Sequence, residues 1–156
     1  MAQEIERKFL PRSEAWRAQV ESSERVRQGY LVADGVRSVR VRITGSRGFL
    51  TIKGKLNGLA RPEYEYGIPL TDAEALLETL CHTPQIDKTR HHVRHAGMLW
   101  EIDEFHGDNA GLIMAEVELA SVDQVVALPD WAGSEVTGDG RYYNSQLAVR
   151  PFSLWT

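Results

Sequence analysis

Glu4-Ile5-Glu6-Arg7-Lys8-Phe9-Leu10 is the stretch that decides how the rest of the chain folds. Alternate side chains of a β-strand point to opposite faces of the sheet. The charged side chains at positions 4, 6 and 8 therefore share one face, and Ile5 and Phe9 share the other. One charged strand face of this kind is typical of any solvated sheet, so the stretch becomes informative only if the pattern recurs.

The same alternation recurs along the chain, with polar or charged residues at every second position and mostly apolar residues between them. Seven strand-like runs show it: Glu4/Glu6/Lys8, Arg40/Arg42, Thr51/Lys53/Lys55, Glu63/Glu65, Lys88/Arg90, Glu101/Asp103 and Glu116/Glu118. Both signs of charge occur, and the opposite faces are apolar. This combination indicates a sheet whose charged face is enclosed and functional, whereas any single run is equally consistent with an exposed, solvated face.

Composition limits the classes of protein to which the chain can belong. Its 156 residues suffice for one domain, residues 1–156, with a real core. The net charge of −4 gives no overall attraction to nucleic acid or to an anionic membrane. No apolar run approaches a membrane span of roughly 18 residues, and we expect no signal peptide. The single cysteine, Cys81, rules out an internal disulfide and favours a cytoplasmic protein.

The order of elements predicts an α+β fold with about eight strands and a few short helices. Strands are expected over residues 3–10, 25–33, 36–44, 49–55, 61–69, 85–95, 98–105 and 112–120. Asp34-Gly35 and Ala96-Gly97 are hairpin turn signals. Helices are expected over residues 14–20, 71–80, 122–128 and 141–149. Because successive hairpins give antiparallel neighbours, the sheet should be mostly antiparallel.

An eight-stranded barrel has an interior wide enough for side chains or one small ligand. Burying an ion costs several kcal/mol even after relaxation, so a dry interior lined by both signs would be unstable. The sequence therefore predicts a water-containing tunnel that holds metal ions and a polyanion. Its apolar strand faces should point outward and be covered by the short helices.

Two sets of charged residues carry the expected chemistry. Carboxylates and water are the ligands that Mg²⁺ prefers, with phosphate oxygens completing its shell, and the acidic set is Glu4, Glu6, Glu63, Glu65, Glu101, Asp103, Glu116 and Glu118. Arginine binds phosphate oxygens bidentately and lysine acts on them as a point charge, and the basic set is Arg40, Arg42, Lys53, Lys55, Lys88 and Arg90.

These residues resemble the ordered motifs of the CYTH domain, the superfamily of triphosphate tunnel metalloenzymes. Glu4-x-Glu6-x-Lys8 is similar to its ExExK signature, a short and unspecific motif by itself. The ordered series extends the match over nearly the whole chain: Arg40-x-Arg42, Leu50-Thr51-Ile52-Lys53-Gly54, Glu63-x-Glu65, Lys88-x-Arg90, Trp100-x-x-Asp103-x-Phe105 and Glu116-x-Glu118. The chain most resembles the compact bacterial inorganic triphosphatases, which also share the pattern of Arg141-Tyr142-Tyr143-Asn144.

The resemblance implies a role for each matching residue. The metal ligands would be Glu4, Glu6, Asp103, Glu116 and Glu118, with Mg²⁺ or Mn²⁺ as the ion. The phosphate-binding cations would be Lys8, Arg40, Arg42, Lys53, Lys88 and Arg90. The catalytic set would be Glu4, Glu6, Lys8, Tyr30, Glu63, Glu65 and Lys88, in which Glu63 and Glu65 position cations or water. Glu101 receives no role.

The leading functional hypothesis is a metal-dependent hydrolase of inorganic tripolyphosphate, acting as a monomer or homodimer on this small-molecule substrate alone. An enzyme of an organic triphosphate is the second reading, either a thiamine triphosphatase or a class IV adenylate cyclase. A polyphosphate- or nucleotide-binding module without activity is the third. A pure binder has little use for so many carboxylates, because they repel a polyanion.

Substrate length is expected to matter in so narrow an interior. Pyrophosphate would be too short to span the metal ions and the cationic residues together, and ATP would have to leave its nucleoside outside one mouth. Tyr30 is a candidate to obstruct such a mouth, with packing in the outer core as the alternative. Residues 135–147 contain two glycines and are a candidate lid, with a capping helix as the alternative.

Overall fold

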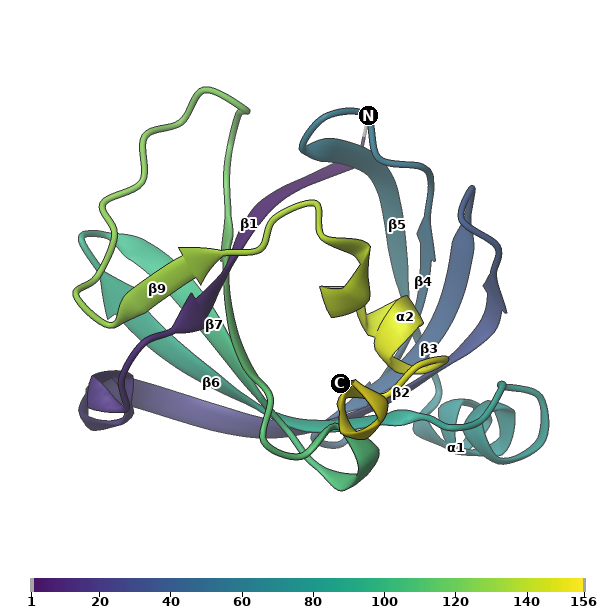
Figure 1. Cartoon of the computed structure of the whole chain (residues 1–156). Coiled ribbons are helices and arrows are strands. Elements are labelled where there is room, and N and C mark those ends of the chain that lie inside the picture. The colour runs from purple at the N-terminus through teal and green to yellow at the C-terminus, as the bar shows by residue number, and fades with distance from the viewer. Residues whose placement is uncertain (1, 156) are drawn as a thin grey trace.

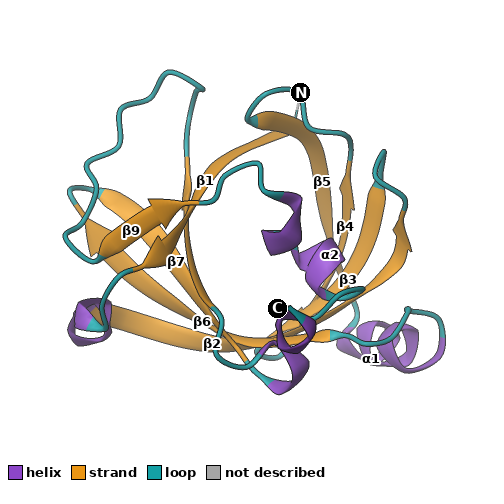
Figure 2. Cartoon of the chain, in the orientation of Figure 1, coloured by secondary structure: helices purple, strands orange, loops and turns teal. Residues whose placement is uncertain are grey.

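The computed structural model describes residues 2–155, and antiparallel strands wrapped into a barrel dominate it (Figures 1 and 2). The strands are β1 (Gln3–Pro11), β2 (Val20–Ala33), β3 (Ser38–Thr44), β4 (Arg47–Lys53), β5 (Ala60–Ile68), β6 (Ile86–His95), β7 (Met98–Phe105), β8 (Ile113–Glu118) and β9 (Ala132–Glu135). The order in the sheet is β5-β4-β3-β2-β6-β7-β8-β1-β9, with a further pairing between β5 and β1. The predicted eight-stranded antiparallel barrel is confirmed, and β9 is an additional short strand.

Strand β1 closes the barrel because its two halves pair with different neighbours. Residues 3–5 pair with β5, in the register Glu4 to Arg61, whereas residues 6–9 pair with β8, in the register Glu6 to Glu118. Beyond residue 5 the edge facing β5 turns to β9 instead. In Figure 1 the C-terminal segment runs from β9 across the middle of the barrel towards α2.

Both predicted hairpins form, but only Ala96-Gly97 is a two-residue turn; at Asp34-Gly35 the register pairs Ala33 with Ser38, so the loop spans residues 34–37. In the turn between β2 and β3, the carboxylate of Asp34 accepts hydrogen bonds from the backbone of Val36 and Arg37, and Gly35 has a φ of 84°. In the turn between β6 and β7, Ala96 and Gly97 both have positive φ, at 51° and 79°. Left-handed conformations at both central positions match the twist of the flanking strands.

The apolar faces of the barrel point outward, as expected, and form two separate hydrophobic clusters with the segments that pack on them. Over β3 and β4, Val41 packs against Ala73 and Leu77 of α1 (Leu70–Thr79). Gly48 of β4 allows this approach, since a Cβ atom there would lie 2.8 Å from that of Ala73. Over β6, β7 and β8, Trp100 lies between Phe9 and Trp131 at ring-centroid distances of 5.6 and 5.4 Å.

One end of the barrel interior is apolar rather than charged. Tyr30, Ile86, Phe105 and Met114 share the inward parity of the charged residues, yet they form a buried cluster with Leu147. Leu147 belongs to α2 (Asn144–Leu147), and the cluster is extended by side chains of the segment through Trp155. The C-terminal segment therefore closes this end of the barrel, which is how the candidate lid of residues 135–147 is placed.

One of the four predicted helices forms as expected, two are shorter and one is absent. Helix α1 matches the expectation for residues 71–80, while residues 14–20 and 141–149 form only η1 (Ala15–Gln19), η3 (Gly140–Tyr142) and α2, and two further 3₁₀ turns are η2 (Gly107–Asn109) and η4 (Phe152–Leu154). The helix expected at 122–128 is wrong. That stretch is irregular, and its valines favour extended backbone, with Val125 89% exposed. Within residues 2–155, no helix has the length and apolar character needed to cross a bilayer.

Candidate active site

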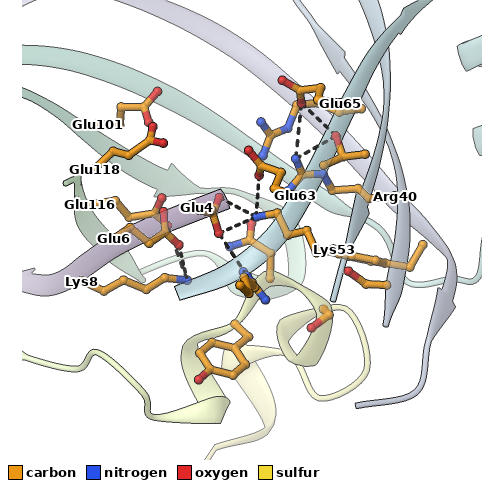
Figure 3. A pocket seen from close by; sticks show the side chains of 18 of the residues that line it. Glu4, Glu6, Lys8, Arg40, Lys53, Glu63, Glu65, Glu101, Glu116 and Glu118 are labelled. Carbon is orange, nitrogen blue, oxygen red and sulfur yellow. Dashed lines mark hydrogen bonds and ion pairs between the residues drawn. The ribbon is translucent and has the colours of Figure 1, made fainter. Parts of the chain in front are cut away.

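A charged cavity of about 230 Å³ occupies the barrel interior (Figure 3). Of the predicted acidic, basic and catalytic residues it gathers all but Asp103 and Lys55, namely Glu4, Glu6, Lys8, Tyr30, Arg40, Arg42, Lys53, Glu63, Glu65, Lys88, Arg90, Glu101, Glu116 and Glu118. Lys55 does not contribute, because β4 ends at Lys53 and Lys55 is exposed. Seven strands thus deliver their charged faces to one enclosed space, as the recurring alternation predicts.

One side of the cavity is positively charged, and we call it the cationic wall: Arg40 and Arg42 of β3 with Lys88 and Arg90 of β6. Burial, together with Arg40 and Arg90, lowers the pKa of Arg42 to about 9. Burial, partly offset by Asp103, lowers the pKa of Lys88 to about 7. The Nε of Arg40 is buried and has no hydrogen-bond partner within residues 2–155. Crowded cations with an unused donor are suited to bind an anion.

The facing side is negatively charged, and we call it the acidic wall: Glu6 of β1 with Glu116 and Glu118 of β8. Burial and the nearby Glu116 raise the pKa of Glu6 to about 7. Burial, with Glu4 and Glu101, also raises the pKa of Glu118, which lies opposite Glu6 in the strand register. Lys8 bridges the wall, with its Nζ 3.6 Å from Glu6 and 3.7 Å from Glu116.

Asp103 lies behind the cationic wall and does not line the cavity. Its side chain has no exposed surface, and its oxygens accept hydrogen bonds from Lys88 Nζ at 2.7 Å and from Arg90 Nε and Nη2 at 2.8 and 2.9 Å. Although burial opposes this, Arg90 and Lys88 hold the pKa of Asp103 well below its usual range. Both oxygens are occupied by cations, so the geometry favours a positioning role over metal ligation.

Glu4, Glu63 and Glu65 are likewise engaged with cations. Glu4 accepts hydrogen bonds from Lys53 at 2.8 Å and from Arg61 at 3.1 Å, and these cations lower its pKa against the effect of burial. Glu63 lies 3.3 Å from Lys53.

Glu65 accepts a hydrogen bond from Thr51 at 2.8 Å and lies 3.7 Å from Arg40. Glu63 and Glu65 therefore lie beside cations of β4 and β3, and the positioning role expected for them stays a prediction.

Tyr30 lines the cavity at its apolar end and is 6% exposed. The expectation that it stands at an open mouth is not met, because its ring packs with Ile86, Phe105 and Leu147 where the C-terminal segment closes the barrel. The alternative of the outer core is also not met, since Tyr30 faces inward beside Arg40, its partner in the β2–β3 register.

Neutral side chains also belong to the site, and charge patterning alone overlooks them. Gln28 is fully buried and accepts a hydrogen bond from Arg42 at 2.9 Å. Asn144 accepts hydrogen bonds from Gln28 at 2.9 Å and from Lys88 at 3.0 Å. Parity places Gln28 on the same face as Tyr30, and Asn144 lies in the motif at residues 141–144, so weak signals for both were present in the sequence.

No three histidine, cysteine or acidic side chains of residues 2–155 are already gathered closely enough to hold a metal ion. The acidic wall nevertheless has the chemistry of a cation site. Like-charged carboxylates raise one another's pKa when they share a site, and a cation between them removes that cost. Mg²⁺ keeps several waters and takes only one or two carboxylates, with substrate oxygens as further ligands.

Comparison with known proteins agrees with this geometry. The family model of the CYTH domain matches residues 2–146. A protein of Acetivibrio thermocellus named inorganic triphosphatase is 45% identical over 152 residues, with 97% of each chain covered. One of Nitrosomonas europaea with the same name is 38% identical, covering 94% of this chain and 97% of that protein. A crystal structure of an inorganic triphosphatase superposes with a TM-score of 0.68 at 36% identity over 96% of each chain.

Proposed function

The chain belongs to the CYTH domain family, and on that premise we propose that it hydrolyses inorganic tripolyphosphate with the help of a divalent metal ion. The observation that carries the proposal is the pairing of two facing walls of opposite charge in one cavity of about 230 Å³. The names of the two relatives agree with this substrate, and both are matched along nearly their whole length.

The cationic wall would bind the substrate. At neutral pH a triphosphate carries about four negative charges, and Arg40, Arg42 and Arg90 supply planar donor groups suited to its oxygens. These groups are held before the substrate arrives by the strand backbone and by their side-chain contacts, which are Glu65 for Arg40, Gln28 for Arg42 and Asp103 for Arg90. Preorganised cations of this kind stabilise the charge of a loose phosphoryl-transfer transition state without reorganisation.

The acidic wall would hold the metal. Membership of the family implies a divalent ion, and we propose Mg²⁺ or Mn²⁺ on Glu6, Glu116 and Glu118, with phosphate oxygens and water as the other ligands. When bound, such an ion neutralises phosphate charge and makes a coordinated water more acidic. Glu4 and Asp103 would act by positioning Lys53, Lys88 and Arg90.

The reaction requires no covalent intermediate on the protein. The oxygen of a water molecule forms a bond to the terminal phosphorus, and the bridging P–O bond to the rest of the chain breaks. Orthophosphate and pyrophosphate leave, and the protons of the water pass to phosphate oxygens or to solvent. The role of the protein's side chains is to orient the triphosphate and to stabilise its charge.

Length selection follows from the two walls. We propose that pyrophosphate is too short to span the metal ions and the whole cationic wall at once, and misplacing the reacting phosphorus by about 1 Å can cost on the order of a hundredfold in rate. One end of the barrel is closed by the C-terminal segment, so ATP would have to place its nucleoside at the other end, beside Glu101 and Glu118. We therefore propose that tripolyphosphate is preferred over both.

A phosphate-release screen tests the proposal. Tripolyphosphate, pyrophosphate, ATP and thiamine triphosphate are compared in Mg²⁺, in Mn²⁺ and in EDTA. We expect the fastest release from tripolyphosphate, with pyrophosphate accumulating as the second product, and none in EDTA. Binding without turnover would instead identify a binding module, and release of pyrophosphate with a cyclic nucleotide from ATP would identify a cyclase.

The remaining assignments rest on the sequence. We propose a single domain over residues 1–156 that acts in the cytoplasm as a monomer or homodimer, in keeping with its lone Cys81 and net charge of −4.

A further inference from the structure

Two neutral amides connect the cations on opposite flanks of β2. The Nε of Arg42 on β3 donates to Gln28 Oε1 at 2.9 Å, and Gln28 Nε2 donates to Asn144 Oδ1 at 2.9 Å. The same Oδ1 accepts from Lys88 Nζ on β6 at 3.0 Å. Because arginine and lysine only donate hydrogen bonds, both amide oxygens must face the cations, which fixes the orientation of both side chains.

In the hydrogen-bonded series Arg42–Gln28–Asn144–Lys88, Asn144 is the one residue that does not come from a barrel strand. The segment that presents it is fastened to β1, where the backbone N–H of Val136 donates to the Lys8 carbonyl at 2.9 Å and that of Lys8 donates to Thr137 Oγ1, also at 2.9 Å. Farther on, Leu147 is fully buried, and the backbone N–H of Phe152 donates to Asn109 Oδ1 at 2.8 Å. Asn144 is therefore held in place from both sides.

An amide at these positions has an effect that a carboxylate lacks. It accepts a hydrogen bond from a cation and fixes its direction, but it leaves the positive charge uncancelled. Asp103 already neutralises part of the charge of Lys88 and Arg90. A second carboxylate beside Lys88 would stabilise the empty protein, since it would relieve the repulsion between buried cations, and it would compete with a polyanion for the same ammonium group.

From this geometry we propose that Gln28 and Asn144 are positioning residues for triphosphate binding. They hold Arg42 and Lys88 in the binding arrangement without adding a negative charge that would compete with the substrate. Through Asn144 the C-terminal segment becomes part of the phosphate site in addition to closing the barrel. The inference rests on the proposed function only in taking tripolyphosphate as the ligand.

The decisive substitution is Asn144→Asp, which retains the shape and the acceptor oxygen and adds one negative charge. We expect the melting temperature to equal or exceed that of the wild type. The KM for tripolyphosphate should rise by about tenfold to a hundredfold, the factor that corresponds to one hydrogen bond to a charged group, while kcat changes much less. Gln28→Glu adds a charge beside Arg42 and should also raise KM, which provides a second variant if the first misfolds; because it loses the hydrogen bond that Gln28 Nε2 donates to Asn144 Oδ1, its stability is not compared.

Gln146→Glu is the matched control, because residue 146 lies on the same helical turn, is exposed, and receives the same added charge. It should leave KM within about twofold of the wild type, as expected for a screened surface charge. The proposal is overturned if Asn144→Asp binds tripolyphosphate as tightly as the wild type, or if it loses activity only in proportion to a loss of stability.

Calorimetric titration with tripolyphosphate separates this inference from the proposed function. A wild-type protein that binds tripolyphosphate without hydrolysing it would defeat the proposed function, while the affinities of the variants would still decide the role of the amides. A wild-type protein that neither binds nor hydrolyses tripolyphosphate would defeat both.

Discussion

The cationic and acidic walls differ in sign but share one physical condition. In both, side chains of like charge lie close together in the barrel interior. Partial desolvation and this repulsion lower the pKa values of Arg42 and Lys88 and raise those of Glu6 and Glu118, whereas Lys8 and Arg90 lower the pKa of Glu116. The carboxylates outside the acidic wall, Glu4, Glu63, Glu65 and Asp103, each lie within 4 Å of a lysine or arginine. The difference indicates which charges stabilise the fold and which remain available to ligands.

This contrast explains why the interior is stable enough to fold and still able to bind. Matched pairs such as Asp103 with Arg90 compensate for desolvation through hydrogen bonds at 2.8 and 2.9 Å. Arg42 on one wall and Glu118 on the other form no ion pair within residues 2–155; such unmatched charges raise the free energy of the empty site, and a ligand of opposite sign removes that cost. A bound polyanion would neutralise the cationic wall in this way, and a bound divalent cation would neutralise the acidic wall.

Neutralising a member of the acidic wall should have the largest effect on turnover. Glu118→Gln keeps the size of the side chain and removes one carboxylate from the proposed metal site. We expect metal-dependent phosphate release to fall by at least about a hundredfold, because the ion loses both a ligand and a balancing charge. The exposed Glu78→Gln on α1 is the control and should keep full activity. Unchanged turnover in Glu118→Gln would refute the metal assignment.

Two neighbouring residues of β3 separate the role of the inward face of the barrel from that of its outward face. Arg40 faces the cavity and Val41 packs under α1, and both are buried. Arg40→Ala should weaken tripolyphosphate binding by about tenfold or more and leave stability unchanged or improved, since it relieves like-charge repulsion. Val41→Ala should leave binding intact and cost about 1–3 kcal/mol in the free energy of unfolding.

Urea denaturation and calorimetry on the two variants would measure both quantities. If Arg40→Ala and Val41→Ala changed stability and binding in the same way, the polar interior of the barrel would be the wrong description.

The pH dependence of stability compares the two walls directly. The pKa of Glu6 is raised from 4.5 to about 7, so between these pH values the folded state binds more protons than the unfolded state. The stability that Glu6 contributes is therefore lost as pH rises from 4.5 through 7. Lys88, with its pKa lowered from 10.5 to about 7, loses a proton earlier, so stability is regained as pH rises from 7 towards 10.5. Metal-free protein without phosphate should therefore be least stable near pH 7.

Urea denaturation in EDTA between pH 5 and 9 would measure this minimum in the free energy of unfolding. In Glu6→Gln, the free energy of unfolding should no longer fall as the pH rises towards 7. Most proteins are instead most stable between about pH 5 and 8. A plateau or maximum near pH 7 in this protein would show that the walls are already neutralised.

Much of the fold and site follows from the sequence because strand parity is a strong constraint. A period of two places Arg40 inside and Val41 outside without knowledge of the tertiary structure, and repeated over seven strands it defines the cavity. Ile52 shows where this reasoning stops, since it faces outward as parity requires but is 38% exposed rather than covered by a helix. Strand parity predicts which face of the sheet a residue lies on, but it does not predict which part of that face the helix covers.

The remaining features depend on contacts between distant segments. Tyr30 packs at the closed end only because residues 136–155 return to cover it, and no local pattern encodes that return. Gln28 and Asn144 are neutral, so charge counting passes over them. Asp103 follows the pattern of the other carboxylates, and only the side-chain geometry shows that Lys88 and Arg90 occupy both of its oxygens.

Calorimetric titration of tripolyphosphate in EDTA tests the division of labour between the walls most directly. With no divalent ion present, the polyanion experiences only the charges of the protein. The account predicts that Arg40→Ala binds about tenfold more weakly than the wild type, whereas Glu118→Gln binds as tightly or more tightly, because it removes a repelling carboxylate. Equal weakening in both variants would contradict the assignment of the cationic wall to the triphosphate and the acidic wall to the metal.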